Sequence, residues 1–265
     1  MTAIRLLDGA DVPAAKILLE RVGLPGGAAN IARYLRWQPD GAWGGFDGDA
    51  LAGMVTLLRH GAAGFVGCMG VEPARQGRGL GRELLEHAHG EGRRAGVSTF
   101  LLEATPAGAR LYRNLGYVDE HETAVLGRAA AGAADVAPIG HELAAICELD
   151  RAATASARDA MLAGLAGEFP GAVARTAGGL AGFGVVVGDR LGPLIARDPG
   201  AGRALVDRLA PGCANAALPL ANEPALAALA AHGFTELRRL RRMRLGPALP
   251  SRTAWIWALA SPGAG

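Results

Sequence analysis

The sequence has no closely spaced cysteines and no apolar run long enough to cross a membrane. Its three cysteines, Cys68, Cys147 and Cys213, are odd in number and far apart, which favours buried free thiols over disulfides or a zinc site. The longest apolar stretches, such as residues 51–58 and 180–187, stop well short of the roughly 18 residues that a membrane span needs. The N-terminal residues contain no apolar signal core. We therefore expect a cytoplasmic protein with no membrane partner.

Lysine, aromatic residues and net charge are also scarce. Of the 27 basic residues only Lys16 is a lysine, aromatic residues make up 5% of the chain, and the formal net charge is +2. A charge so close to zero argues against a polyanionic partner, so we expect no nucleic-acid binding. The one dense basic run, Arg238 to Arg244, fits a solvated strand or an ion-pair face between domains better. Half of the residues are hydrophobic, which is enough to form a substantial core.

Strand and helix signals alternate along the first 125 residues, which predicts an α/β fold. The expected strands are Ile4–Leu7, Ala42–Phe46, Ala50–Leu58, Gly64–Val71 and Ser98–Glu103. The expected helices are Val12–Arg21, Ala28–Arg36, Gly79–Ala95 and a last one with Thr105 as N-cap, Pro106 as first residue and Gly116 as stop.

Three segments of the first half recur in the second half in the same order. Residues 50–58 resemble residues 179–187, residues 79–85 resemble 200–206, and residues 112–117 resemble 229–234. Such ordered repetition predicts a duplicated domain. The segment Arg128–Asp135 consists largely of small residues without an apolar face and is typical of a linker. We therefore predict domains at residues 1–126 and 139–265, joined by a linker at 127–138.

The sharpest local feature is a glycine-rich loop between an expected strand and an expected helix. Its sequence is Val71-Glu-Pro-Ala-Arg-Gln-Gly-Arg-Gly-Leu-Gly81. Consecutive backbone amides at a helix N-terminus can bind an anion, and Arg75, Arg78 and Arg82 add positive charge. A P-loop is excluded because no Lys-Ser/Thr pair follows the last glycine, and the third glycine comes one position too early for the dinucleotide-binding fingerprint.

Two motifs resemble those of the GNAT superfamily of acyl-CoA-dependent N-acyltransferases. Gln76-Gly-Arg-Gly-Leu-Gly81 resembles the Gln/Arg-x-x-Gly-x-Gly/Ala motif, and Leu111-Tyr-Arg-Asn-Leu-Gly-Tyr117 resembles the LYxxLGF helix, with Tyr in place of Phe. Residues 101–108 and the internal repeat further resemble a tandem-domain subgroup, although Glu103 stands where that subgroup has aspartate. The resemblance implies two GNAT-like domains, each a mostly antiparallel mixed sheet flanked by helices.

The resemblance also implies a reaction and a set of site residues. The first domain would transfer an acetyl group from acetyl-CoA to a primary amine by direct attack in a ternary complex, without a metal ion. The pyrophosphate would lie on the amides of the loop, the pantetheine arm along the preceding strand at Met69-Gly70-Val71, and the thioester near Tyr112. The residues implied in binding acetyl-CoA are Met69, Gly70, Val71, Gln76, Gly77, Arg78, Gly79, Leu80, Gly81, Arg82 and Thr105.

The reaction needs a base for the amine and a proton donor for the leaving thiolate. The neutral form of a lysine-like amine costs about 4–5 kcal/mol at pH 7, which a base or a desolvating pocket must offset. Glu103 is our first candidate for the base and Glu72 our second, although either could be an ordinary solvated carboxylate. Tyr112 faces inward on its expected helix and is our candidate donor, which would work best with a somewhat lowered pKa.

The second domain departs from the motif at several positions. Asp198 places a negative charge where pyrophosphate would lie, Pro199 removes an amide, and Leu229 stands in the place of Tyr112. We therefore predict one acetyl-CoA per chain and a structural or substrate-shaping second domain in a monomer that forms a pseudo-dimer. The acceptor is expected to be a small-molecule or peptide amine. The alternative function is that of a non-catalytic module that binds or senses acyl-CoA.

Overall fold

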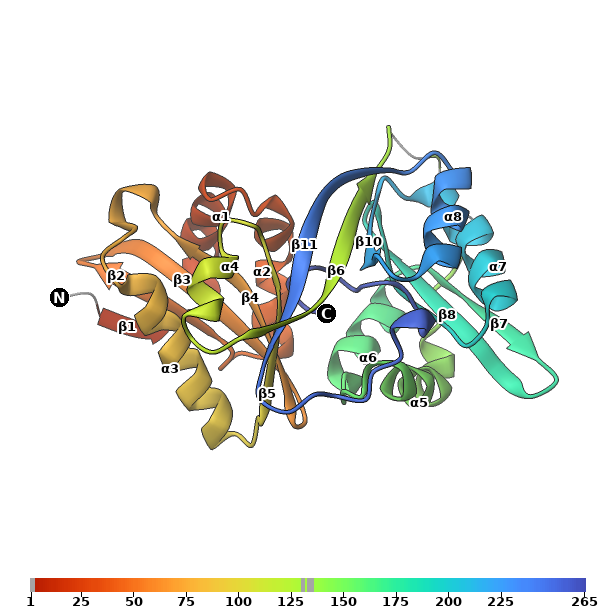
Figure 1. Ribbon diagram of the computed structural model, residues 1–265, viewed down its shortest axis with the longest axis horizontal. Helices are drawn as coiled ribbons and strands as arrows, with labels where there is room; N and C mark the ends of the chain where they lie inside the picture. The colour runs from red at the N-terminus through yellow and green to blue at the C-terminus, as the bar shows by residue number, and fades with distance from the viewer. Residues whose placement is uncertain (1–2, 130–131, 133–135) are drawn as a thin grey trace.

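The computed structural model describes residues 3–129, 132 and 136–265. The first half has the predicted alternation of strands and helices (Figure 1). Its strands are β1 (Ala3–Leu6), β2 (Ala42–Asp47), β3 (Ala50–His60), β4 (Ala63–Val71), β5 (Thr99–Ala104) and β6 (Val118–Gly127). Its helices are α1 (Val12–Arg21), α2 (Pro25–Trp37), α3 (Leu80–Arg94) and α4 (Ala109–Arg113).

Local sequence signals explain where most of these elements begin and turn. Helix α1 has Pro13 in its first turn, where the missing N–H breaks no helical hydrogen bond. Gly48 adopts a φ of 58° in the turn between β2 and β3, a conformation that side chains disfavour. The apolar face of α3 is buried, with Leu84 and Leu85 fully covered. The elements that flank the candidate loop are therefore those that the sequence predicts.

Helix α4 is shorter than predicted and starts later. Thr105 is not the N-cap of α4. Its Oγ1 instead accepts a hydrogen bond from the amide of Gly108 at 3.1 Å, within a turn that precedes the helix. The helix begins at Ala109, so Pro106 is not its first residue. Gly116, with a φ of 88°, follows the helix as predicted.

The second half repeats the order of elements from α1 to β6 and adds a final strand, β12. Its helices are α5 (Leu143–Thr154), α6 (Asp159–Glu168), α7 (Pro199–Leu209) and α8 (Glu223–Ala231). Its strands are β7 (Gly171–Thr176), β8 (Gly179–Val187), β9 (Arg190–Ala196), β10 (Asn215–Pro219), β11 (Thr235–Leu245) and β12 (Ile256–Ala258). The amide of Tyr117 donates to the Tyr112 carbonyl at 3.1 Å, and the amide of Phe234 donates to the Leu229 carbonyl at 3.2 Å. The repeat therefore extends to individual hydrogen bonds after α4 and α8.

Much of the predicted linker lies outside the described residues, namely 130–131 and 133–135. Its second residue, Arg128, is described and is held in place. The Arg128 guanidinium donates to the carbonyls of Cys213, Ala210, Pro211 and His232, at 2.7–3.0 Å. Four carbonyl acceptors fix the end of the first half onto the second half.

One continuous sheet joins the two halves. Its strand order is β1-β2-β3-β4-β5-β11-β6-β10-β9-β8-β7, with β12 paired to β9. The strands that follow α4 and α8 are therefore exchanged, because β11 pairs with β5 of the first half and β6 pairs with β10 of the second half. Figure 1 shows β11 and β6 side by side at the centre of the molecule. The halves interlock through backbone hydrogen bonds as well as through side chains.

The basic run Arg238–Arg244 belongs to the exchanged strand β11, and its charges pair with the first half. Arg241 contacts Asp119 at 3.0 Å, and Arg244 contacts Glu120 at 2.9 Å. On the same strand Leu240 and Met243 lie in different core clusters, because both faces of β11 are covered. This explains why the apolar spacing fits neither a half-exposed strand nor a helix.

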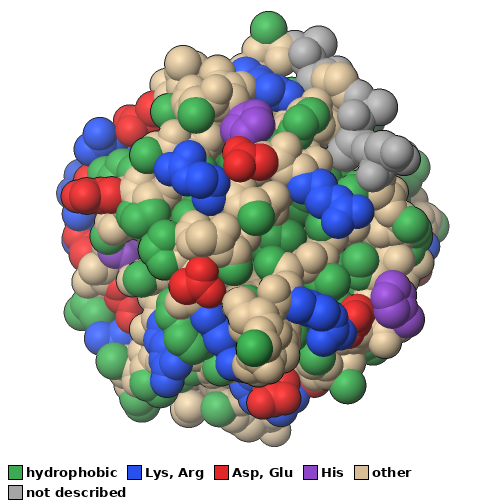
Figure 2. Space-filling view, turned by 90° about the vertical axis from the view of Figure 1, so that its right-hand side faces the viewer, with side chains coloured by type: hydrophobic (Ala, Val, Ile, Leu, Met, Phe, Trp, Pro, Cys, Tyr) green, Lys and Arg blue, Asp and Glu red, His purple; other side chains and the backbone are tan. Residues whose placement is uncertain are grey.

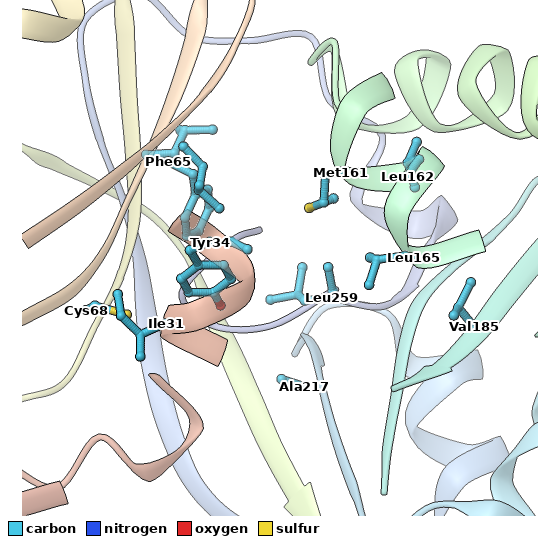
Figure 3. Packing of buried hydrophobic residues seen from close by; sticks show 14 of the residues in the cluster. Ile31, Tyr34, Phe65, Cys68, Met161, Leu162, Leu165, Val185, Ala217 and Leu259 are labelled. Atoms are coloured by element: carbon cyan, nitrogen blue, oxygen red, sulfur yellow. The ribbon is translucent and has the colours of Figure 1, made fainter. Parts of the chain in front are cut away.

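The core follows the same division into halves with a shared centre. One cluster lies under α3 and α4 and another under α7 and α8. A third cluster joins Ile31, Tyr34 and Phe65 of the first half to Met161 and Leu165 on α6 of the second half (Figure 3). Because these side chains share one buried cluster, the halves form a single packed unit.

The surface carries charges of both signs. On the face in Figure 2, the charged side chains are interspersed among uncharged and hydrophobic ones. No described helix is both long enough and apolar enough to cross a membrane. Within the described residues, no group of three or more His, Cys, Asp or Glu side chains is placed to hold a metal ion.

Candidate active site

Strands β4 and β5 pair only at their N-terminal ends. The parallel pairing runs from Ala63 with Thr99 to Phe65 with Leu101 and then stops. Beyond it β4 is bulged, and Cys68 has a φ of 45°. In the described part of the chain, residues 69–71 therefore pair with β3 only and leave their other edge open. The open edge is the segment that the sequence predicts to receive the pantetheine arm, Met69, Gly70 and Val71.

The glycine-rich loop follows this open edge and leads into α3. The Gln76 side-chain amide donates to the Val71 carbonyl at 2.9 Å, which ties the loop back to β4. Gly77 and Gly79 have φ values of 75° and 93°, in the left-handed region that favours glycine. Gly81 is required for a different reason, because a Cβ there would stand 3.1 Å from Cε of Met69.

The backbone amides of this loop are free to bind a ligand. Gly79 is the N-cap of α3 and offers no side-chain cap. Among the described residues, none of the six amides from Gly77 to Arg82 donates a hydrogen bond within the protein. Because α3 is 15 residues long, its N-terminus also carries the partial positive charge of the helix dipole. This arrangement suits an anion such as a pyrophosphate.

The three arginines of the loop are not equally available. Arg75 forms an ion pair with Asp47, the last residue of β2, and Arg82 contacts Glu86 at 3.5 Å. Arg78 is exposed, and no described acidic side chain pairs with it. The side-chain charge available to an anion at this loop is therefore mainly that of Arg78.

Tyr112 lies on α4 and faces inward, as predicted. Its side chain is only 9% exposed and packs edge-on against Tyr117, with ring centroids 5.7 Å apart. Burial raises the pKa of Tyr112 above its ordinary value, which contradicts our expectation of a lowered pKa. The hydroxyl is therefore protonated at neutral pH, as a hydrogen-bond donor must be.

The structure adds a residue pair that the sequence did not reveal. The spacing of His87 and His89 on one helix favours surface positions, but the His89 ring is buried, and its Nε2 lies 2.7 Å from the hydroxyl of Tyr117. The tyrosine at the end of the LYxxLGF-like motif therefore has a buried partner for its extra oxygen. The sequence signal for this pair is the tyrosine that replaces the phenylalanine of the motif, because a buried hydroxyl needs a hydrogen-bond partner.

Glu103 is not a solvated carboxylate. Its side chain is fully buried, and its Oε1 accepts a hydrogen bond from Nε of Arg242 at 2.7 Å. Its other oxygen, Oε2, is buried without a partner among the described residues. Arg242 comes from β11, so the second half supplies the contact. Glu72, the other candidate base, is partly exposed and contacts Arg21 at 3.5 Å.

The corresponding site in the second half is closed. The Asp198 side chain caps α7 by accepting a hydrogen bond from the Ala201 amide at 2.9 Å. The gap between β9 and β10 is filled by β12, which pairs with β9, and the Leu259 amide donates to the Ala217 carbonyl at 2.7 Å. Trp257 covers Gly202, where a Cβ would lie 2.1 Å from its ring. The alternating segment Trp255–Leu259 thus completes the second half, because it contains β12.

Comparisons with known proteins agree with this architecture. Family models described as acetyltransferase (GNAT) domains match residues 40–119 and residues 146–258. A protein from Pyrococcus horikoshii assigned to the acetyltransferases is 23% identical, with a TM-score of 0.86 over 100% of this chain and 96% of that chain. A GCN5-related N-acetyltransferase from Sphaerobacter thermophilus is 18% identical, with a TM-score of 0.65 over 95% of this chain and 98% of that chain. At these identities the likeness shows the fold. A comparison with curated proteins gave no match.

Proposed function

Because the chain belongs to the GNAT acetyltransferase family, with two such domains in tandem, we propose that its first half transfers acetyl groups from acetyl-CoA to a primary amine. The observation that carries the proposal is the open N-terminus of α3 beside the open edge of β4. The six free amides of residues 77–82 suit the pyrophosphate, and the edge at residues 69–71 suits the amide groups of the pantetheine arm. The acceptor is a small-molecule or peptide amine.

The chemistry is a direct displacement. The amine nitrogen forms a bond to the thioester carbonyl carbon, the carbon–sulfur bond breaks, and coenzyme A leaves as a thiolate. The amine loses one proton and the thiolate gains one. Two groups of this chain are proposed to move these protons, Glu103 on the amine side and Tyr112 on the thiolate side.

A comparison within the molecule supports the role of Glu103. Arg242 stands opposite Glu103 across the junction of β11 with β5. At the repeat-related junction of β6 with β10, Val125 stands opposite Ala217. An apolar pair is therefore sufficient to build this junction, whereas a buried ion pair carries a desolvation penalty. The unpartnered Oε2 of Glu103 supplies the acceptor that a base needs.

The test is turnover with an identified acceptor. A screen of amines for thiol release from acetyl-CoA would find that acceptor. Tyr112→Phe should leave acetyl-CoA affinity unchanged and lower turnover by about 10²-fold or more. Tyr117→Phe is the matched control, since it removes a neighbouring hydroxyl that is bonded to His89. Unaltered turnover in Tyr112→Phe would remove Tyr112 from the mechanism.

One observation favours the alternative, a module that binds acyl-CoA without transfer. Burial raises the pKa of Tyr112, which makes its proton harder to transfer to a thiolate. Calorimetric binding of acetyl-CoA, with no thiol release from any amine in the screen, would support that alternative.

A further inference from the structure

A pocket separate from the candidate active site lies between the two halves, next to α2. Side chains from α2, from the residue after α6 and from the turn between β8 and β9 line it. Those that define its chemistry are Arg33, Tyr34, Trp37, Phe169, Asp189 and Arg190. The pocket therefore contains two cations, one carboxylate and three aromatic rings.

Arg190 is partly buried, and no described acidic side chain forms an ion pair with it. Its side chain reaches from β9 to the first half, where Nη2 lies 3.3 Å from the position that a Cβ would take on Gly26 of α2. Within the described part of the chain, no side chain or carbonyl pairs with its guanidinium. Burial lowers the pKa of Arg190 below its ordinary value, and this effect outweighs the attraction of the neighbouring Asp189 carboxylate.

Arg33 is the second cation of the pocket, and it contacts aromatic rings and an amide side chain. Its guanidinium lies 4.7 Å from the ring centroid of Phe169 and 6.0 Å from that of Trp37, and it donates to the Asn30 side chain. Its Nε is buried without a partner among the described residues. Burial also lowers the pKa of Arg33.

The nearby carboxylates do not neutralise these two arginines. Asp189 accepts a hydrogen bond from the Asn215 side chain at 2.7 Å, and no ion pair joins it to Arg33 or Arg190 in the described residues. Glu168 pairs with Arg36 at 3.1 Å. Both arginines line the pocket, are partly buried and lack an ion-pair partner among the described residues, so an anion that enters the pocket gains their attraction.

The pocket lies on the face of the sheet opposite α3, and we infer that the acceptor approaches from this face. Tyr34 lines it and belongs to the same buried cluster as Phe65 and Cys68 of β4 (Figure 3). Cys68 is the residue at the bulge just before the open edge of β4. The opposite face of the sheet packs against α3, whose N-terminus forms the proposed cofactor site.

We propose that this pocket binds an acidic group, a carboxylate or a phosphate, on the acceptor amine. The assignment of the bound anion to the acceptor rests on the proposed acetyl transfer, whereas anion binding itself does not. The two arginines, from different halves, converge on the acidic group. The aromatic rings exclude water around it.

The first experiment measures anion binding without any reaction. Inorganic phosphate and acetate at about 20 mM, at constant ionic strength, should each be compared by thermal unfolding. At least one should raise the Tm of the native protein by about 2–4 °C, and Arg190→Gln or Arg33→Gln should abolish that gain. Arg208→Gln, a change at an exposed arginine on α7, should preserve it. Phosphate can also bind at the α3 loop, so a Tm gain in the native protein alone does not identify the pocket. The loss of that gain in the pocket variants, and not in Arg208→Gln, identifies it.

The second experiment measures selectivity with pairs of amines. An amino acid is compared with its carboxamide, and an aminoalkyl phosphate with the parent amino alcohol, which separates carboxylate from phosphate recognition. The acidic member of one pair should have at least a tenfold higher kcat/KM, and Arg190→Gln should remove this preference through KM.

The two experiments test the anion site and its role in acceptor recognition independently. An anion effect that survives both Arg190→Gln and Arg33→Gln overturns the site. Equal use of acidic and neutral amines overturns its role in acceptor recognition. If no amine is acetylated but the anion effect depends on Arg190, the proposed transfer is wrong and the anion site stands.

Discussion

The two halves place the same helix N-terminus in opposite situations. In the first half α3 begins with Gly79, its amides are free, and the neighbouring strand has an open edge. In the second half Asp198 caps α7, and β12 occupies the corresponding gap. The two halves therefore share a backbone scaffold but differ in whether the helix N-terminus is open. A single carboxylate and one added strand are enough to close the site.

The largest expected effect is loss of acetyl-CoA binding. Replacing Gly79 and Gly81 with valine should abolish it, because Gly79 has a positive φ and a Cβ at Gly81 would contact Met69. Native protein should bind one acetyl-CoA per chain by calorimetry. Gly200→Ala on α7 is the control and should leave the stoichiometry at one. Two equivalent sites would contradict the division between the halves.

The next effect tests the closed site. Trp257 is fully buried against Gly202, so Trp257→Ala should lower the free energy of unfolding by about 3–5 kcal/mol. Acetyl-CoA stoichiometry should remain one, because Asp198 still caps α7. A second binding event in this variant would show that the tryptophan alone closes the site.

A smaller effect separates the ion pair from the fold. Glu103→Ala combined with Arg242→Val gives the first half the Ala217–Val125 arrangement of the second. Stability should change little, because a buried ion pair is replaced by apolar groups, while turnover should fall by about 10²-fold. Arg242→Val alone should destabilise the protein, since it leaves a buried carboxylate without a partner. Full turnover in the double variant would exclude Glu103 as the base.

The smallest effect concerns His89 and Tyr117, whose counterparts by the repeat are Ala210 and Phe234. Tyr117→Phe should cost about 1–3 kcal/mol by leaving His89 unpaired, and His89→Leu with Tyr117→Phe should recover part of that loss. Equal stability of both variants and the native protein, by chemical denaturation, would contradict a role for this hydrogen bond.

The same histidine predicts a pH dependence of stability. Burial lowers the pKa of His89 to about 4. In the unfolded chain this histidine becomes protonated near pH 6.5, whereas in the folded protein it stays neutral until about pH 4. The free energy of unfolding therefore falls as the pH drops across this window. The double variant should show a shallower decline. An identical decline would show that other groups control it.

The sequence predicted those features that depend on neighbouring residues. Helix α1 spans the predicted Val12–Arg21, and the glycine-rich loop lies between a strand and a helix as expected. The exchange of β6 and β11 was not predicted, because the residue pattern of each strand does not show which half it pairs with. The burial of Glu103 was missed for the same reason, since its partner Arg242 lies 139 positions away.

The strand exchange has a consequence for the order in which the chain acquires its structure. During synthesis the first half emerges well before β11, so one edge of β5 stays unpaired until almost the whole chain has been made. An unpaired edge can add a strand from another molecule. Residues 1–126 expressed alone should therefore associate or aggregate. We expect neither half to fold as an independent domain. Nascent chains that stop before residue 235 are the form most in need of a chaperone.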